Sequence, residues 1–167
     1  MTEKRVYIGL GSNLGDRLTY LREAVRQIAA IMRVERVSSL YIAAPTVKLR
    51  DDAYLNAVLC GYTTTKPLGL LKQLQAIECG MGRRPGVSYG PRPIDLDILL
   101  YGSVHIDQLE IKIPHPELSR RAFVLKPLAE LDPQLMHPVL YYSVSQLLQD
   151  ADEADTIVMY NPPTLDP

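Results

Sequence analysis

The stretch Gly90–Gly102, GPRPIDLDILLYG, decides the fold because a Gly- and Pro-rich turn leads directly into an apolar strand. Side chains alternate between the two faces of a strand, so Asp95 and Asp97 are expected on one face and the apolar residues on the other. Those apolar residues are Ile94, Leu96, Ile98 and Leu100. Two like charges on one face repel each other, and burial adds a desolvation cost. The pattern therefore predicts that a positively charged group binds beside the two acids.

The segments before this strand repeat one order of elements. Apolar periodicity predicts strands over residues 4–10, 34–41 and 54–63, and helices over about 15–32 and 67–80. With the strand of the opening stretch, this gives strand–helix–strand twice. That is the split βαβ order of a ferredoxin-like α+β sandwich, a mainly antiparallel sheet with flanking helices, which we expect on one face.

The chain beyond Gly102 has weaker patterns. Residues 111–116 read as a short extended piece held by two prolines, and residues 120–131 read as a helix in which Pro127 can start a new turn. A last short helix is predicted over 142–149. We expect a frayed tail from Asn161, with the chain peripheral from about residue 155, and a single domain over residues 1–167.

Composition excludes several classes of protein. The chain has 167 residues, 47% hydrophobic and 22% charged, with a net charge of −1, which predicts a soluble domain that binds neither nucleic acid nor a membrane surface. No signal peptide or membrane span is evident. Cys60 and Cys79 lack metal-like spacing and read as free thiols. We therefore expect a cytoplasmic protein, and a monomer.

The glycine-rich run Gly9–Asp16, GLGSNLGD, lies between a predicted strand and a predicted helix, where phosphate-binding loops also lie. It lacks the Lys-Ser/Thr pair of a P-loop, and its spacing is not G-x-G-x-x-G. The run therefore favours a tight turn, with a helix cap from Ser12 or Asn13.

Around the two acids, the residue types suit a metal and phosphate site. Carboxylates on alternate strand positions can hold one or two hard cations, and Mg²⁺ combines a few carboxylates with substrate phosphates. Arginines, which complement phosphates, stand before and after the acids. They are Arg83, Arg84, Arg92, Arg120 and Arg121. His115, between two prolines, could donate to a phosphate.

Tyr54 and Asn56 alternate on the predicted strand 54–63, so both face one side. Together they offer a stacking plane and a donor–acceptor edge, which suit a flat heterocycle. Ordinary strand residues remain the alternative for this pair.

Four segments together resemble the 6-hydroxymethyl-7,8-dihydropterin pyrophosphokinases of folate biosynthesis. They are YIGLGSNLGDR, YLNAV, GPRPIDLDILLYG and IPHPELSRRAFVLKPL, in order from about residue 5 to 140. The resemblance implies transfer of pyrophosphate from ATP to the pterin hydroxymethyl group, with AMP as the other product. It also implies two Mg²⁺ ions bound by Asp95 and Asp97.

The resemblance assigns further residues by position. The catalytic residues are Arg83, Arg92, Asp95 and Asp97. The ATP-binding residues are Gln75, Glu78, Arg83, Arg84, Arg92, Ile98, His115 and Arg121. The pterin-binding residues are Ala44, Thr46, Tyr54, Asn56, Tyr89, Asp95 and Phe123, with Phe123 and Tyr89 as the two stacking planes. By the same likeness, residues 82–93 are expected to close over the substrates.

Some positions depart from the family pattern. The family usually has a basic residue at Ser88 and threonine at Ala43, and some members have tyrosine at Pro116. Two other functions stay open on the sequence. One is an inactive ferredoxin-like module that senses a nucleotide or a pterin, and the other is a nucleotidyltransferase that releases pyrophosphate.

Overall fold

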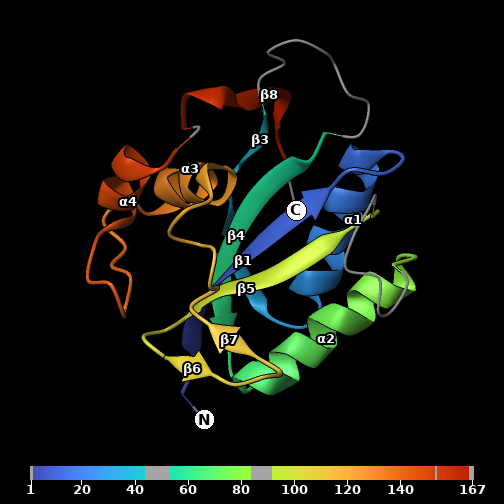
Figure 1. Ribbon diagram of the computed structural model, residues 1–167. Coiled ribbons are helices and arrows are strands. Elements are labelled where there is room, and N and C mark those ends of the chain that lie inside the picture. Colours follow the sequence, from blue (N-terminus) through green and yellow to red (C-terminus); the bar gives the residue numbers. More distant parts are fainter. Residues whose placement is uncertain (1, 44–52, 84–91, 153, 166–167) are drawn as a thin grey trace.

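The computed structural model of the chain describes residues 2–43, 53–83, 92–152 and 154–165 (Figure 1). One main sheet has the strand order β5-β1-β4-β3-β8, and β2 also pairs with β4. All of these pairs are antiparallel. The strands of this sheet are β1 (Lys4–Ser12), β2 (Arg33–Val37), β3 (Ser39–Ala43), β4 (Leu55–Thr63), β5 (Asp95–Tyr101) and β8 (Ile157–Thr164).

The helices are α1 (Arg17–Ala29), α2 (Pro67–Gly80), α3 (Ala122–Leu131) and α4 (Val144–Asp150), followed by a short 3₁₀ helix, Ala154–Thr156. A two-stranded ribbon joins β6 (Ile106–Asp107) to β7 (Lys112–Ile113). The α+β sandwich, with a mainly antiparallel sheet, confirms the predicted fold class. Pro127 lies inside α3 and does not end it.

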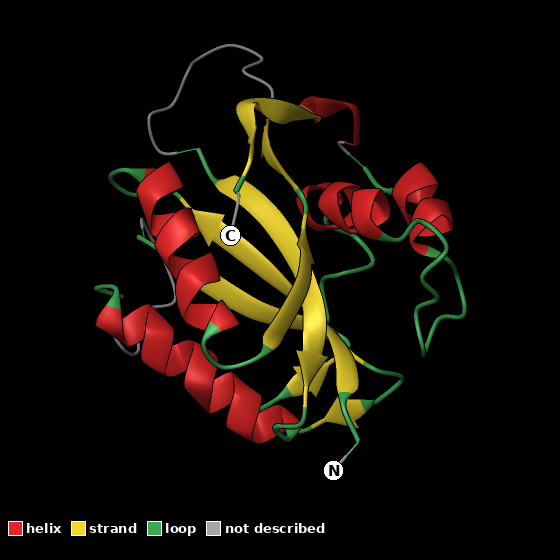
Figure 2. Ribbon diagram, turned by 180° about the vertical axis from the view of Figure 1, so that it is seen from behind, coloured by secondary structure: helices red, strands yellow, loops and turns green. Residues whose placement is uncertain are grey.

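Helices cover both faces of the sheet (Figures 1 and 2). The core under α1 and α2 contains Leu21, Ile28 and Leu70, whereas α3 and α4 pack Leu125 and Leu147 into a second core on the other face. The expectation of helices on one face therefore holds for α1 and α2 and is wrong for α3 and α4. The later pair carries its own apolar stripes, which need a second sheet face to bury them.

A β-bulge in β5 changes the predicted alternation. Opposite β1, Tyr7 pairs with Leu100 and the next residue, Ile8, pairs with Ile98, so Leu99 is the extra residue. Ile98 stays in the core under α1 and α2, but Leu99 and Leu100 both join the core under α3 and α4. The prediction that Leu100 shares a face with Ile98 is wrong, because a bulge inverts the alternation that follows it.

The predicted strand over 34–41 is two strands, β2 and β3, separated at Ser38. The hydroxyl of Ser38 accepts from the backbone N–H of Val58 on β4, and the Ser38 N–H donates to the carbonyl of Val58. These bonds replace regular ladder pairing at the break. Both halves therefore still lie against β4.

Two further expectations are wrong, one for the C-terminal tail and one for the glycine-rich run before α1. The segment 157–164 is not frayed, because it forms β8 and pairs with β3, and Leu165 after it is buried. The glycine-rich run is not a turn at Gly11, because β1 continues to Ser12. The cap of α1 is Asp16, whose carboxylate accepts from the Thr19 N–H, and neither Ser12 nor Asn13 has that role.

Candidate functional site

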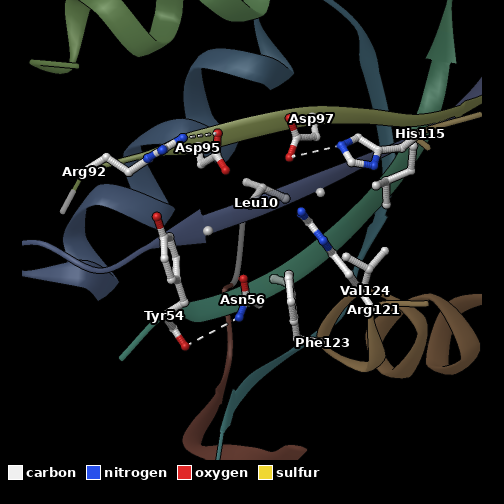
Figure 3. A pocket seen from close by; sticks show the side chains of 14 residues that line it. Leu10, Tyr54, Asn56, Arg92, Asp95, Asp97, His115, Arg121, Phe123 and Val124 are labelled. Carbon is white, nitrogen blue, oxygen red and sulfur yellow. Dashed lines mark hydrogen bonds and ion pairs between the residues drawn. The ribbon is translucent and has the colours of Figure 1, made fainter. Parts of the chain in front are cut away.

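A cavity of about 490 Å³ lies over β5, β1 and β4, on the sheet face that also carries α3 (Figure 3). Antiparallel register sets a transverse row of side chains here: Asp95 pairs with Gly11, Gly11 with Asn56, and Asn56 with Tyr41. We call Asp95, Gly11, Asn56 and Tyr41 the transverse row. Its cross-strand neighbours share one face, so the sheet brings the acid of β5 opposite the amide of β4.

The floor of the cavity is β1, at Gly9 and Gly11. Both glycines lie on the cavity side, between the acids of β5 and the residues of β4. A Cβ atom on Gly11 would lie 3.0 Å from the Asn56 Oδ1 atom and 3.3 Å from the Tyr54 ring. The missing side chains therefore keep the space between the two neighbouring strands open.

The two acids of β5 face this cavity as the alternation predicts, and 40% of the Asp97 side chain is exposed there. Desolvation raises the pKa of Asp97 to about 7, and the negative charges of Asp95 and Glu78 act in the same direction. A bound cation would remove this cost, because it favours the ionised form. The electrostatics thus fit the prediction of a positive group beside the pair.

Arginines partly neutralise Asp95. Its Oδ1 atom accepts from Arg83 Nη1 at 2.8 Å and lies 3.5 Å from Arg92 Nη1. Arg83 also donates to Glu78, a buried residue of α2 whose carboxylate accepts from the Leu96 N–H at 2.9 Å. Burial raises the pKa of Glu78. Glu78 therefore anchors Arg83 against β5 from behind the cavity.

The backbone of Arg92 is held by Asn13. The Asn13 side-chain oxygen accepts from the Arg92 N–H at 2.8 Å, and the Asn13 N–H donates to the Arg92 carbonyl at 3.2 Å. Asn13, within the glycine-rich run, therefore fixes the segment that enters β5. This is a structural role for a residue that the sequence suggested as a helix cap.

His115 is placed by the bulge in β5, since its N–H donates to the carbonyl of Leu99 at 2.9 Å. Its Nδ1 atom accepts from the Glu117 N–H at 3.1 Å, so the neutral ring carries its proton on Nε2. That atom lies 4.0 Å from Asp97 Oδ2. Burial and the charge of Arg121 lower the pKa of His115. The ring therefore presents a neutral N–H donor to the cavity.

The wall opposite the acids combines β4 with the start of α3 (Figure 3). Asn56 lines it from β4, and Tyr54 lines it from the position just before that strand. Phe123 and Val124 line it from α3. The Arg121 guanidinium lies over the Phe123 ring, 5.6 Å from its centre. This wall offers an aromatic plane and an amide edge, while the β5 side offers charge. The cavity therefore has an aromatic half and an ionic half.

Eight of the residues named from the sequence line the cavity together: Tyr54, Asn56, Arg92, Asp95, Asp97, His115, Arg121 and Phe123. Five others within the described residues do not. Arg83 is paired with Asp95 and Glu78 outside the lining, and Arg120 is exposed and pairs with Glu117. Gln75 is exposed on α2, Glu78 lies behind Arg83, and Ile98 packs in the core under α1 and α2 because its position is opposite in phase to the acids. Ala44, Thr46, Arg84, Ser88 and Tyr89 lie outside the described residues, as does most of the segment expected to close over the substrates.

The sequence did not point to the cavity floor. The pattern places Gly9 near the end of the strand predicted over residues 4–10 and Gly11 in a turn, although two glycines separated by one residue can also mark one face of a strand against which other groups pack closely. The apolar continuation of the strand through Leu10 was the available signal.

The donor set fits Mg²⁺ bound together with phosphate. Within the described ranges, no group of three or more His, Cys, Asp or Glu side chains is arranged to hold a metal ion. Two carboxylates facing one cavity are hard oxygen donors, and Mg²⁺ completes its shell with water and substrate phosphates.

The helices were also considered as membrane spans. Of the helices in the described part of the chain, none has the length and apolar character to cross a membrane.

Comparison with known proteins gives consistent similarities. The family model of 7,8-dihydro-6-hydroxymethylpterin-pyrophosphokinase (HPPK) matches residues 7–133. The 2-amino-4-hydroxy-6-hydroxymethyldihydropteridine pyrophosphokinase of Aquifex aeolicus is 37% identical over 134 residues, 80% of this chain and 84% of that protein. The protein of that name from Bacillus subtilis is 45% identical over 132 residues, 77% of this chain and 78% of the relative.

The fold also matches a solved structure, Plasmodium falciparum HPPK-DHPS with pterin and p-hydroxybenzoate, with a TM-score of 0.75 and 15% identity. The match covers 95% of this chain and 46% of that one. At this identity the likeness concerns the fold. This chain spans less than half of the solved chain.

Proposed function

This chain belongs to the 7,8-dihydro-6-hydroxymethylpterin-pyrophosphokinase (HPPK) family, and from that premise we propose how its cavity divides the two substrates. The protein is a pyrophosphokinase of folate biosynthesis, which transfers pyrophosphate from ATP to the hydroxymethyl group of 6-hydroxymethyl-7,8-dihydropterin and leaves AMP. That activity separates it from the two other functions left open by the sequence, an inactive sensor and a nucleotidyltransferase.

The aromatic half of the cavity is the proposed pterin site. Phe123 offers a ring face for stacking, and Asn56 offers a donor and an acceptor to the ring edge. Tyr54 lies beside Asn56 on the same wall. Gly11, between Asn56 and Asp95, keeps the space in which the hydroxymethyl group would meet the phosphates.

The ionic half is the proposed site of the ATP phosphates. Asp95 and Asp97 would hold two Mg²⁺ ions, and Arg92, Arg121 and the Nε2–H of His115 would bind phosphate oxygens. When bound, the two ions would neutralise phosphate charge and make the β-phosphorus more open to attack. The protein's own task is to position the reactants and stabilise charge, as in other phosphoryl transfers.

The proton of the attacking hydroxyl has a nearby acceptor in this arrangement. Asp95 lies in the transverse row with Asn56, and it is the acid closer to the proposed pterin site. Its Oδ1 atom is approached by Arg83 and Arg92, so we assign proton acceptance to Oδ2. Asp95 thus belongs to both halves of the cavity.

Two further features are part of this proposal. The described residues of one chain form the aromatic and the ionic half together, which supports a monomer. Both cysteines are free thiols, which supports a reducing compartment such as the cytoplasm.

The observation that carries the proposal is the pair of acids across one cavity from the aromatic wall, and Asp97→Asn tests it. This substitution removes a charge while keeping the shape of the side chain. With ATP, hydroxymethyldihydropterin and Mg²⁺, we expect kcat for AMP formation to fall at least about a hundredfold, the size seen when preorganised charge stabilisation is lost. The melting temperature should not fall, because the change relieves repulsion.

The matched control is Asp107→Asn, on the exposed β6 strand, where Asp107 pairs only with Lys112 among the described side chains. It should keep normal AMP formation. Near-normal AMP formation by the Asp97→Asn protein, with an unchanged dependence on Mg²⁺ concentration, would disprove the metal role.

A further inference from the structure

Behind the aromatic wall lies Tyr41, the residue of the transverse row that does not reach the cavity. It sits on β3, directly across from Asn56, and its side chain is 8% exposed. Tyr41 is therefore a buried neighbour of a proposed pterin residue rather than a contact of the substrate.

The two ends of the Tyr41 side chain contact two ends of α3. Its ring belongs to a small core cluster with Ala122, and Phe123 packs against that cluster. Its hydroxyl donates to Glu130 Oε2 at 2.6 Å, two turns further along the helix. Burial raises the pKa of Tyr41 above its usual range, and the bond to Glu130 adds to the effect. The hydroxyl thus stays a donor throughout the working pH range.

Glu130 also binds the backbone of β3. Its Oε1 atom accepts from the Ser39 N–H and from the Ser39 hydroxyl, both at 2.9 Å. Such charge-assisted bonds are stronger than neutral ones. In the middle of the helix, Lys126 Nζ donates to the carbonyl of Ile157 at 2.5 Å, which ties α3 to β8 as well. Polar bonds therefore fix the position of α3 against β8 and against β3, which pairs with the strand that carries Asn56.

We propose that Tyr41 and Glu130 are positioning residues of the pterin site, which set the distance and tilt of Phe123 relative to Asn56. The inference rests on the proposed role of Phe123. A stacking ring and an amide edge bind one flat ring together only when both are held within a few tenths of an ångström. Tyr41 belongs to the cluster against which Phe123 packs, and its bond to Glu130 keeps that cluster in one place relative to α3.

The test is Tyr41→Phe, which removes the hydroxyl and keeps the ring. We expect the Kd for hydroxymethyldihydropterin, measured with a non-hydrolysable ATP analogue present, to rise about tenfold, the change that corresponds to losing about one hydrogen bond. The Kd of the Mg²⁺-bound ATP analogue alone should change less than twofold. Glu130→Gln should raise the pterin Kd in the same direction, and the double variant should be no weaker than the worse single variant.

Tyr101→Phe is the matched control. Tyr101 is also buried, and its hydroxyl donates to the Thr65 carbonyl at 2.6 Å, at the far end of β5. The Tyr101→Phe protein should lose about as much stability as the Tyr41→Phe protein does, and its Kd for the pterin should stay unchanged. If Tyr41→Phe changes only the melting temperature, as Tyr101→Phe does, the inference is wrong.

Phe123→Ala separates this inference from the proposed pterin site. If Phe123→Ala leaves the pterin Kd unchanged, the proposed role of Phe123 is wrong. If it weakens pterin binding while Tyr41→Phe does not, that role stands and the positioning role of Tyr41 is overturned.

Discussion

At the scale of single residues, the site depends on side chains that are missing as much as on those present. Gly9 and Gly11 place bare backbone between the acids of β5 and the wall on β4. The neighbours differ at the two positions. A Cβ atom on Gly9 would make an ordinary contact of 3.4 Å with the end of the Leu99 side chain, whereas one on Gly11 would press on Asn56. The space over Gly11 is therefore the more constrained.

This difference gives a prediction for Gly11→Ala. The new methyl group would displace the Asn56 amide from the proposed pterin edge, so we expect KM for the pterin to rise about tenfold, as for one lost hydrogen bond. Steady-state kinetics with each substrate varied in turn would measure it. Gly80→Ala, where no atom lies within 4 Å of the added carbon, is the control and should leave both KM values unchanged. An unaltered pterin KM in Gly11→Ala would show that the Asn56 position does not matter.

At the scale of elements, the sequence predicted well wherever one periodicity ran without interruption. The helix over 67–80 begins at Pro67 and ends at Gly80 as expected, because a proline start and a repeated leucine face leave little ambiguity. The two acids of β5 share the predicted face for the same reason. This part of the site followed from alternation alone.

Apart from the cap of α1, which is local, the wrong predictions involve contacts between segments distant in the chain. Nothing local in DLDILLY indicates that Leu99 is an extra residue, because the bulge is defined by pairing with β1. The strand over 157–164 carries two prolines and looks like a loop, and it forms by pairing with β3 at the sheet edge. The packing of α3 on this sheet likewise involves tertiary bonds, such as the one that the Tyr41 hydroxyl of β3 donates to Glu130.

The loop between α3 and α4 carries a prediction of pH dependence. His137 is buried, and its Nδ1 atom accepts from the N–H groups of Val139 and Leu140 at 3.2 and 3.1 Å. Burial and the charge of His105 lower the pKa of His137 below the 6.5 of the unfolded chain. The unfolded state therefore binds this proton first, and stability present above pH 6.5 is lost as the pH falls.

The comparison that isolates this residue is the wild type against His137→Gln, since Asp97 and His115 titrate in both. The difference in the free energy of unfolding, from urea denaturation, should be constant above pH 7 and shrink towards pH 5.5, by up to about 1.4 kcal/mol per pH unit. A difference that does not vary with pH would contradict the prediction.

At the scale of the whole molecule, the last strand is part of the core rather than an appendage. Leu165 is 2% exposed and belongs to the same core as residues of β1, α1 and α2. Ile157, at the start of β8, packs with Tyr41 and Ala122 beside the aromatic wall. The C-terminal segment therefore joins the main core to the helix that carries Phe123.

Leu165→Ala should accordingly destabilise the whole protein. We expect the free energy of unfolding to fall by about 2–5 kcal/mol, as for other large-to-small changes in cores. Met159→Ala, on the same strand but 55% exposed, is the control and should change it by less than about 0.5 kcal/mol. Urea denaturation followed by circular dichroism would measure both. Equal small effects would mean that the end of the chain adds nothing to the core.

The transverse row has one more consequence. Each of its members comes from a different strand, β5, β1, β4 and β3, and each faces the cavity side only in the observed register. A slip of one residue in any strand would turn its member towards the opposite core. Turnover therefore reports on strand pairing. After refolding, only molecules in which all four strands have the observed register would produce AMP. Measurements of helix content or compactness would also include molecules whose strands are paired in another register.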